Sequence, residues 1–238
     1  MIPEWQKGIV RSIEDATYNT RRYWIELPGT QRFDFKPGQF VTIDLPIHEQ
    51  RNKRWRSYSI ASAPDGGNVI ELVIVLVDGG SGSTYFFEQV KVGTELTLRG
   101  PHGVFVLPEP IEKELFMICT GTGIAPFRSM LHYIHENKLT YSKLHLIFGT
   151  RTQKDLLYAD EMHGFEKLLP SFTYYPTLSR EEWDGLRGYV HSVYEALCEK
   201  KPDADFMLCG WRNMIDEAKH RILDLGYDKK AIHLELYG

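Results

Sequence analysis

Short stretches in which apolar and polar positions alternate dominate the first part of the chain, and they are typical of half-buried β-strands. Such stretches, together with one almost continuously apolar run, predict strands over residues 24–27, 40–45, 55–61, 69–77 and 94–99. Pro-Gly and Asp-Gly-Gly turn signals separate the strands, and one short helix is expected at about residues 83–90. Several short strands with regular turns predict a small antiparallel β-barrel.

In the second part of the chain, apolar strands alternate with amphipathic helical stretches. Strands are expected at residues 115–119, 144–148, 172–178, 206–209 and 232–236. Helical periodicity follows the first of these strands through His135 and returns over residues 214–225. Strand–helix alternation of this kind predicts a doubly wound parallel sheet of the α/β class.

The change between the two patterns lies near Pro108 and Pro110, because proline disrupts strands and helices alike. We therefore expect two domains: an antiparallel β-barrel over residues 1–108 and a doubly wound α/β domain over residues 109–238. A length of 238 residues suits two domains of ordinary size.

Composition and charge exclude several classes of protein. No apolar run reaches the roughly 18 residues that a membrane-spanning helix needs, and the N-terminus lacks a signal-peptide pattern. The three cysteines are far apart, which argues against a disulfide framework or a bound metal cluster and favours the cytoplasm. A net charge of −4 argues against a nucleic-acid partner.

Positive charge is concentrated in one short stretch that contains Arg51, Lys53, Arg54 and Arg56. A charge run of this length is most often a solvated loop. The other interpretation is a docking patch for an acidic partner or for a phosphate group.

The strongest local motif is the glycine-rich turn at residues 119–126, Cys-Thr-Gly-Thr-Gly-Ile-Ala-Pro, which follows an expected strand and opens an expected helix. Glycines let the backbone approach a ligand closely. A helix N-terminus presents free N–H groups and a partial positive charge to a phosphate. A tight turn without a ligand is the alternative, but the position at the start of the second domain favours a nucleotide.

Two stretches of the expected barrel also carry candidate ligand-binding groups. Arg56 can grip a pyrophosphate through forked hydrogen bonds, Tyr58 can lie against an aromatic ring, and Ser59 can donate to a ring nitrogen. Residues 79–84, Gly-Gly-Ser-Gly-Ser-Thr, offer a second anion-binding helix terminus. Taken alone, an ordinary exposed strand and a flexible hairpin loop also explain these stretches.

These stretches, with two motifs near the C-terminus, resemble the ferredoxin–NADP reductase family of flavoproteins, in its bacterial form, over nearly the whole chain. The resemblance implies that Arg56 holds the pyrophosphate of FAD, that Tyr58 packs on the isoalloxazine ring and that Ser59 lies near flavin N5. It assigns a second flavin-binding motif, beside the same pyrophosphate, to Gly82, Ser83 and Thr84.

The resemblance also assigns roles in the second half of the chain. The residues of the turn that would bind the nicotinamide nucleotide are Gly121, Thr122, Gly123, Ile124 and Pro126. Cys209 and Gly210 would place a thiol beside the nicotinamide. Glu235 would lie near the path of the hydride, and Tyr237 would cover the flavin.

The implied catalytic residues are Ser59, Cys209, Glu235 and Tyr237, and no metal is implied. Two positions depart from the family pattern. Trp211 stands where the family often has proline after Cys-Gly, and it either packs on the nicotinamide side or fills core. The chain also runs one residue beyond Tyr237.

The type of nicotinamide nucleotide depends on groups that can bind a 2′-phosphate. Arg151, Arg180 and Arg187 are the candidates, and the Ser-Arg-Glu sequence around Arg180 is similar to the NADP-dependent bacterial members. Trp183 and the glycines that follow it are instead similar to NADH-dependent oxygenase reductases. NADP is therefore favoured, and NAD is the alternative.

The resemblance implies an oxidoreductase that moves a hydride between NADP(H) and FAD and exchanges single electrons with a ferredoxin or flavodoxin. Arg51, Lys53 and Arg54 are the expected docking residues for such an acidic partner. One alternative is the NADH-dependent reductase component of an oxygenase. Another, of a different class, is a flavin-binding relay subunit without its own turnover. The oligomeric state is left open.

Overall fold

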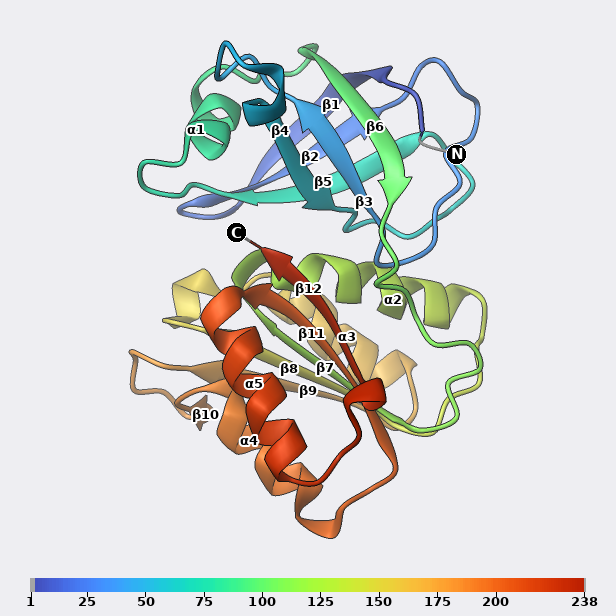
Figure 1. Cartoon of the computed structure of the whole chain (residues 1–238), viewed down its shortest axis with the longest axis vertical. Coiled ribbons are helices and arrows are strands. Elements are labelled where there is room, and N and C mark those ends of the chain that lie inside the picture. The colour runs from blue at the N-terminus through green and yellow to red at the C-terminus, as the bar shows by residue number, and fades with distance from the viewer. Residues whose placement is uncertain (1–2, 238) are drawn as a thin grey trace. The chain divides into compact units, whose positions relative to one another are not determined.

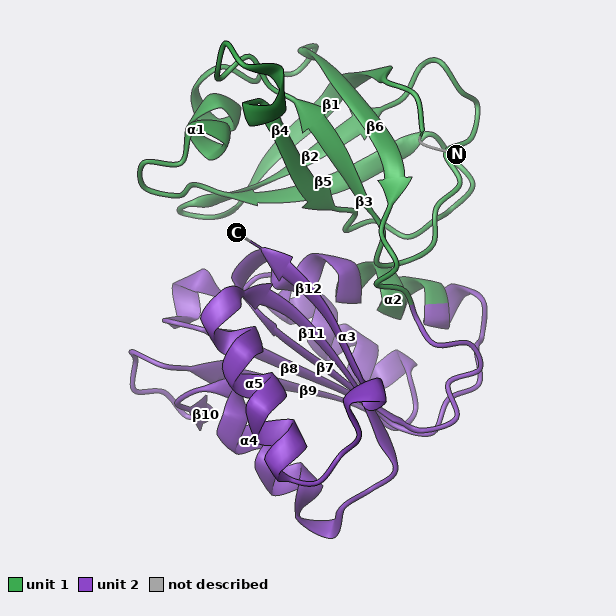
Figure 2. Ribbon diagram, in the orientation of Figure 1, with its two compact units in different colours: residues 1–106, 128–133 green, residues 107–127, 134–238 purple. Residues whose placement is uncertain are grey.

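The structure, a computed structural model, describes residues 3–237 (Figure 1). Its contacts divide the chain into two compact units (Figure 2). Unit 1 comprises residues 1–106 and 128–133, and unit 2 comprises residues 107–127 and 134–238. One segment of the second half of the chain, residues 128–133, thus packs with the barrel strands. The linear boundary at residues 108 and 109 stays a prediction.

Unit 1 contains a six-stranded antiparallel sheet in the order β4-β3-β6-β1-β2-β5. The strands are β1 (Gln6–Thr17), β2 (Thr20–Glu26), β3 (Phe40–Asp44), β4 (Trp55–Ser59), β5 (Val69–Val75) and β6 (Glu95–His102). An isolated antiparallel bridge between Ile60 and Leu72 joins the segment after β4 to β5, which are the two edges of the sheet. The sheet therefore closes into a small barrel, as the sequence pattern predicts.

The core of unit 1 is built from alternate residues of these strands, such as Val41 and Ile43 of β3, which are fully buried. Helix α1 (Ser81–Glu88) adds Phe86 to this core. The hydroxyl of Tyr23 donates to the carbonyl of Phe86 at 3.0 Å, and the two rings meet edge to face at 5.0 Å. Packing and a buried hydrogen bond therefore fix α1 against the barrel.

Three elements differ from the expectations of the sequence pattern. Strand β1 was not expected, because charged and polar residues occupy much of it and only two of its residues, Gly8 and Val10, are buried. Helix α1 begins two residues earlier than expected, at Ser81. A short strand, β10 (Leu186–Arg187), pairs with the edge of the second sheet and was also missed.

Unit 2 contains a six-stranded sheet in which all pairs are parallel, in the order β10-β9-β8-β7-β11-β12. Its other strands are β7 (Glu114–Thr120), β8 (Leu144–Thr150), β9 (Phe172–Leu178), β11 (Ala204–Trp211) and β12 (Ile232–Tyr237). The chain enters at β7, builds outward to β10, and returns to β11 on the other side of β7. The order therefore reverses between β7 and β11, and ligands of such sheets bind at the carboxyl ends of the strands at that point.

Helices cover both faces of this sheet, as Figure 1 shows. The helices are α2 (Ala125–Glu136), α3 (Ala159–Leu168), α4 (Val190–Leu197) and α5 (Arg212–Asp224). Helices α4 and α5 share one core with β7 and β11, and α3 lies behind the sheet. Because both faces are covered, β7 and β8 are almost continuously buried and read as apolar runs. The predicted doubly wound fold is confirmed.

Within residues 3–237, none of the helices has both the length and the apolar character that a bilayer crossing requires.

Gly38 offers a direct test of the packing of unit 1. Its φ is +99°, and an added Cβ would lie 2.0 Å from the carbonyl oxygen of Phe105. We expect Gly38→Ala to lower the free energy of unfolding by about 3 kcal/mol, because both the backbone conformation and the contact become unfavourable. Urea unfolding followed by circular dichroism measures this change.

Gly29→Ala is the matched control, since a Cβ at Gly29 has no neighbour within 4 Å. Its unfolding free energy should stay within about 0.5 kcal/mol of the parent. Equal stability of the two variants would contradict this close contact between Gly38 and Phe105.

Candidate active site

Strand β4 and the N-terminus of α1 lie together in unit 1 and bring two of the expected motifs into contact. The guanidinium of Arg56 donates to the carbonyls of Trp55 and Lys53, at 2.8 and 3.1 Å, and to Ser81 Oγ at 3.2 Å. The stem of Arg56 packs on Gly82, where an added Cβ would lie 3.0 Å from Arg56 Cγ. An anion at this helix terminus would therefore meet a guanidinium and backbone amides together.

The first turn of α1 has no side-chain cap, so no capping side chain accepts from its first amides. Ser83 does not face outward. Its hydroxyl accepts from the amide of Val77 at 3.0 Å and donates to the carbonyl of Gly80 at 2.9 Å. Ser83 thus shapes the loop that precedes α1. The backbone amide of the next residue, Thr84, donates a helical hydrogen bond to the carbonyl of Gly80 at 2.9 Å.

Tyr58 and Ser59 occupy the end of β4. The ring of Tyr58 packs edge to face on Phe86 at 5.4 Å. Burial raises the pKa of the Tyr58 hydroxyl, so it stays protonated at neutral pH. Ser59 is buried, and it pairs with Phe40 of β3. The half-buried ring of Tyr58 offers an aromatic surface next to the Arg56 anion site, which suits a flavin.

In unit 2 the glycine-rich turn follows β7 as a 3₁₀ turn, η2 (Gly121–Ile124), and leads into α2 at Ala125. Gly121 has a φ of +55°, a conformation that favours glycine. Pro126 lies in the first turn of α2, where no amide is needed within the helix. The amides of Thr122, Gly123 and Ile124 belong to this turn, which has no side-chain cap.

The turn lies in close backbone contact with the end of β11. A Cβ on Gly123 would lie 2.4 Å from the carbonyl oxygen of Cys209, and one on Gly210 would lie 2.5 Å from Thr120 Oγ1. Gly210 also has a φ of +134°. Only glycine fits at these two positions, which leaves the strand ends clear of side chains where a dinucleotide would approach.

Cys209, whose carbonyl makes the first of these contacts, is fully buried. Its pKa is raised well above that of a free thiol, mainly by burial and further by the charge of Glu235, so the thiol is neutral. The parallel register pairs Cys209 with Glu235 and Trp211 with Tyr237. Three of the four expected catalytic residues thus lie on two neighbouring strands.

Trp211 is not part of the core, because 57% of it is exposed. Its backbone amide donates to Thr120 Oγ1 at 3.3 Å. Its indole nitrogen lies 3.7 Å from the position that a Cβ on Gly121 would occupy. The ring therefore borders the glycine-rich turn, and the core alternative for this residue is wrong.

The three candidate arginines differ in the contacts of their side chains. Arg151 and Arg180 follow β8 and β9, and the amide of Arg180 donates to the carbonyl of Arg151 at 2.9 Å. Both are exposed, and neither forms an ion pair with another described residue. Arg187 instead pairs with Glu182 and donates to the carbonyl of Trp183 at 3.0 Å. Arg151 and Arg180 are therefore the two candidates for a 2′-phosphate site whose side chains have no ion pair among the described residues.

The basic loop forms a 3₁₀ turn, η1 (Arg51–Lys53), before β4. Arg54 Nε lies 2.8 Å from the carboxylate of Asp44, and Arg51 Nε lies 3.8 Å from it. Lys53 is exposed and has no ion pair among residues 3–237. Nearby, the guanidinium of Arg99 stacks between Trp5 and Trp55 at 4.7 and 4.6 Å.

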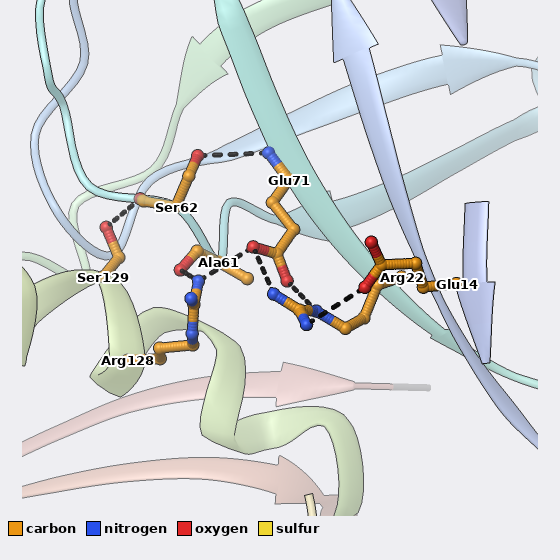
Figure 3. A network of polar contacts seen from close by, with 7 residues as sticks. All are labelled: Glu14, Arg22, Ala61, Ser62, Glu71, Arg128 and Ser129. Carbon is orange, nitrogen blue, oxygen red and sulfur yellow. Dashed lines mark hydrogen bonds and ion pairs between the residues drawn. The ribbon is translucent and has the colours of Figure 1, made fainter. Parts of the chain in front are cut away.

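One buried network was not singled out from the sequence. It joins Glu71, Arg22 and Arg128 (Figure 3). The available signal was a single glutamate inside the apolar run of residues 69–75. Within residues 3–237, no group of three or more His, Cys, Asp or Glu side chains could hold a metal ion.

The chain matches two domain families. The oxidoreductase FAD-binding domain matches residues 7–107, and the oxidoreductase NAD-binding domain matches residues 117–220. Ferredoxin–NADP reductase B of Sorangium cellulosum is 34% identical over 91% of each chain. The anthranilate 1,2-dioxygenase electron transfer component of Acinetobacter baylyi is 32% identical over 79% of this chain, and the match spans 54% of that protein.

A solved ferredoxin NADP+ reductase from Neisseria gonorrhoeae, with bound FAD and NADP, has a TM-score of 0.81 and 27% identity, with 98% of each chain covered. The Amycolatopsis cytochrome P450 reductase GcoB shares the fold at a TM-score of 0.87 and 23% identity, over 98% of this chain and 70% of that one. The barrel, the glycine-rich turn and these matches all indicate the same two-domain family. The chain belongs to the ferredoxin reductase family of FAD- and NAD(P)-binding flavoprotein oxidoreductases.

Proposed function

We propose that the chain is an NADP-linked reductase that exchanges a hydride with NADP(H) and single electrons with a ferredoxin or flavodoxin. The observation that carries the choice of NADP is the exposed pair Arg151 and Arg180, held together by a backbone hydrogen bond. The similarity to a ferredoxin–NADP reductase over 91% of both chains supports it. When bound, FAD supplies the capacity to accept a hydride and to release electrons singly.

Unit 1 binds the flavin in this proposal. Arg56 and the first amides of α1, including that of Gly82, hold the pyrophosphate of FAD. Tyr58 packs on the isoalloxazine ring, and Ser59 places its hydroxyl near flavin N5. Ser83 acts indirectly in this proposal, because its hydroxyl already forms hydrogen bonds with Val77 and Gly80 and so shapes the turn before α1. Thr84 borders this turn.

Unit 2 binds the nucleotide. The amides of Thr122, Gly123 and Ile124 receive the pyrophosphate, and the α2 terminus adds its partial positive charge. The neutral thiol of Cys209 and the carboxylate of Glu235 border the nicotinamide. A neutral thiol adds no charge that would oppose the movement of a hydride, which fits a positioning role better than a nucleophilic one.

A second candidate is the NADH-dependent reductase component of an oxygenase. The match to the anthranilate dioxygenase component favours it, although the chain spans only about half of that protein. A glycine betaine monooxygenase reductase subunit of Pseudomonas aeruginosa is 29% identical over 98% of this chain and 66% of its own length. A relay subunit without turnover is the third candidate, and reduction by a nucleotide alone separates it from the other two.

Anaerobic titration of the holo-protein distinguishes these candidates. We expect NADPH to bleach the flavin absorption with an apparent Kd about 10-fold or more below that of NADH, because two arginines would bind the 2′-phosphate. Preference for NADH would support the oxygenase-type reductase. Absence of bleaching with both nucleotides would exclude the enzyme.

Removal of the arginine pair tests the assignment by residue. Arg151→Ala and Arg180→Ala should each raise the Kd for NADPH by about 10- to 100-fold and leave the Kd for NADH within about 2-fold, because only NADPH carries the 2′-phosphate. Arg187→Ala should have a smaller effect, since Glu182 already engages that side chain. Lys229→Ala is the surface control. Equal losses for both nucleotides would contradict a 2′-phosphate site.

Charge reversal in the basic loop tests the docking of an acidic partner. Replacing Arg51, Lys53 and Arg54 together by Glu should slow electron transfer to an acidic [2Fe–2S] ferredoxin about 10-fold at low ionic strength and flatten its salt dependence. Lys53→Glu should cause the largest single loss, because Asp44 already offsets part of the charge of the two arginines. Stopped-flow mixing gives the rates.

The control for this series is Lys91→Glu, which reverses an exposed lysine outside the loop. Its rate should stay within about 2-fold of the parent. Unchanged rates across the loop variants would remove the basic loop from the proposal.

A further inference from the structure

Glu71 is a buried carboxylate in a strand that is otherwise apolar. It lies in β5, and only 2% of it is exposed. Ile70 and Leu72, its neighbours in the strand, point into the barrel core, so Glu71 lies on the opposite face of β5. A buried ionised group requires charged partners and several hydrogen bonds to persist.

Two guanidinium groups supply these partners (Figure 3). Arg22 of β2 donates to Glu71 through Nε at 2.6 Å and Nη2 at 3.2 Å, and Arg128 of α2 donates through Nη1 at 2.9 Å. Arg22 also lies 3.5 Å from the carboxylate of Glu14. Two acidic and two basic side chains therefore balance in charge.

The network also holds the segment that follows β4, the strand that carries Tyr58 and Ser59. Arg128 Nη1 donates to the carbonyl of Ala61 at 2.8 Å, and Ser129 Oγ donates to the carbonyl of Ser62 at 2.6 Å. From the other side, β5 binds the same two residues: the amide of Ala61 donates to the carbonyl of Glu71 at 2.8 Å, and Ser62 Oγ accepts the amide of Glu71 at 3.1 Å. Ala61 follows Ser59 by two residues, so its position constrains the end of β4.

Net stability does not explain such an arrangement, because well-packed apolar side chains of similar volume would stabilise a fold at least as well as a buried ion pair. Unlike apolar packing, directional hydrogen bonds fix the positions of particular peptide groups. Here the fixed groups are the carbonyls of Ala61 and Ser62, which follow the end of β4 after one intervening residue.

We propose that Arg128 and Ser129 are positioning residues for the flavin site: Arg128, oriented by Glu71, and Ser129 hold the Ala61–Ser62 backbone and thereby set the position of Ser59. The proposal rests on the proposed function, which places Ser59 at the flavin. Residues 128–133 belong to unit 1 by their contacts, so the arrangement lies entirely within that unit.

The test measures FAD affinity and stability separately on purified holo-protein. Arg128→Met keeps the apolar stem and removes the donors, and it should raise the Kd for FAD about 10-fold, since a small misplacement of a binding group is costly. Ser129→Ala should raise it about 3-fold. Release of FAD on dilution is followed by the increase in flavin fluorescence, and the visible absorption of the bound flavin reports its surroundings.

Arg128→Lys gives the rescue. Its ammonium retains donors for both Glu71 and Ala61, so the Kd for FAD should return to within about 3-fold of the parent. Leu96→Ala is the matched control, because it removes a buried side chain of the barrel core on β6. It should lower the thermal midpoint while leaving the Kd for FAD within about 2-fold.

Two failures remain distinguishable. If the parent protein binds FAD and is reduced by a nucleotide, but Arg128→Met weakens FAD no more than Leu96→Ala at an equal loss of thermal midpoint, the network is only structural and the positioning role is overturned. If the parent protein itself is not reduced by either nucleotide, that result contradicts the proposed function, whatever the variants show.

Discussion

The nucleotide half of the protein depends on a steric constraint at the ends of β7 and β11, where backbone meets backbone. Gly123 touches the carbonyl of Cys209, and Gly210 touches Thr120, at distances that any Cβ would prevent. The turn between β7 and α2 therefore lies directly against the end of β11, and no side chain caps it. Cys209 is fully buried. The register of β12 then places Glu235 beside Cys209. The close approach and the register of β12 together bring the turn, the thiol and the carboxylate to the same end of the sheet.

Charges in this molecule divide into two groups with different roles. Where segments far apart in sequence must be held together, charge is buried and compensated, as for Glu71 with Arg128. At three of the positions where the proposal places a ligand or partner, Arg151, Arg180 and Lys53, charge is exposed and without an ion pair among the described residues. Arg51 and Arg54 are instead offset by Asp44. Exposed charges are screened by salt and contribute little to folding. In the proposal, the exposed charges attract phosphate groups or acidic surfaces.

Local patterns in the sequence were sufficient for most of the fold. Apolar runs predicted the buried strands of the parallel sheet, and the turn at residues 121–126 was found because its glycines follow such a run. Strand β1, residues 6–17, was missed because its polar side chains hide the alternation. The orientation of Ser83 and the engagement of Arg187 by Glu182 depend on contacts between side chains, which no local pattern reports. Local motifs were sufficient to name candidate site residues, but not the contacts that each of their side chains makes.

The assignment of residues 128–133 to the barrel unit has a consequence for how this protein can be recombined. A gene segment that encoded only residues 1–106 would carry Glu71 without Arg128, and so leave a carboxylate buried with part of its compensation gone. The flavin-binding part is therefore not a cassette that can be exchanged at a single junction. In shuffled or inherited variants, the glutamate and the arginine must be kept or replaced together, although 57 positions separate them.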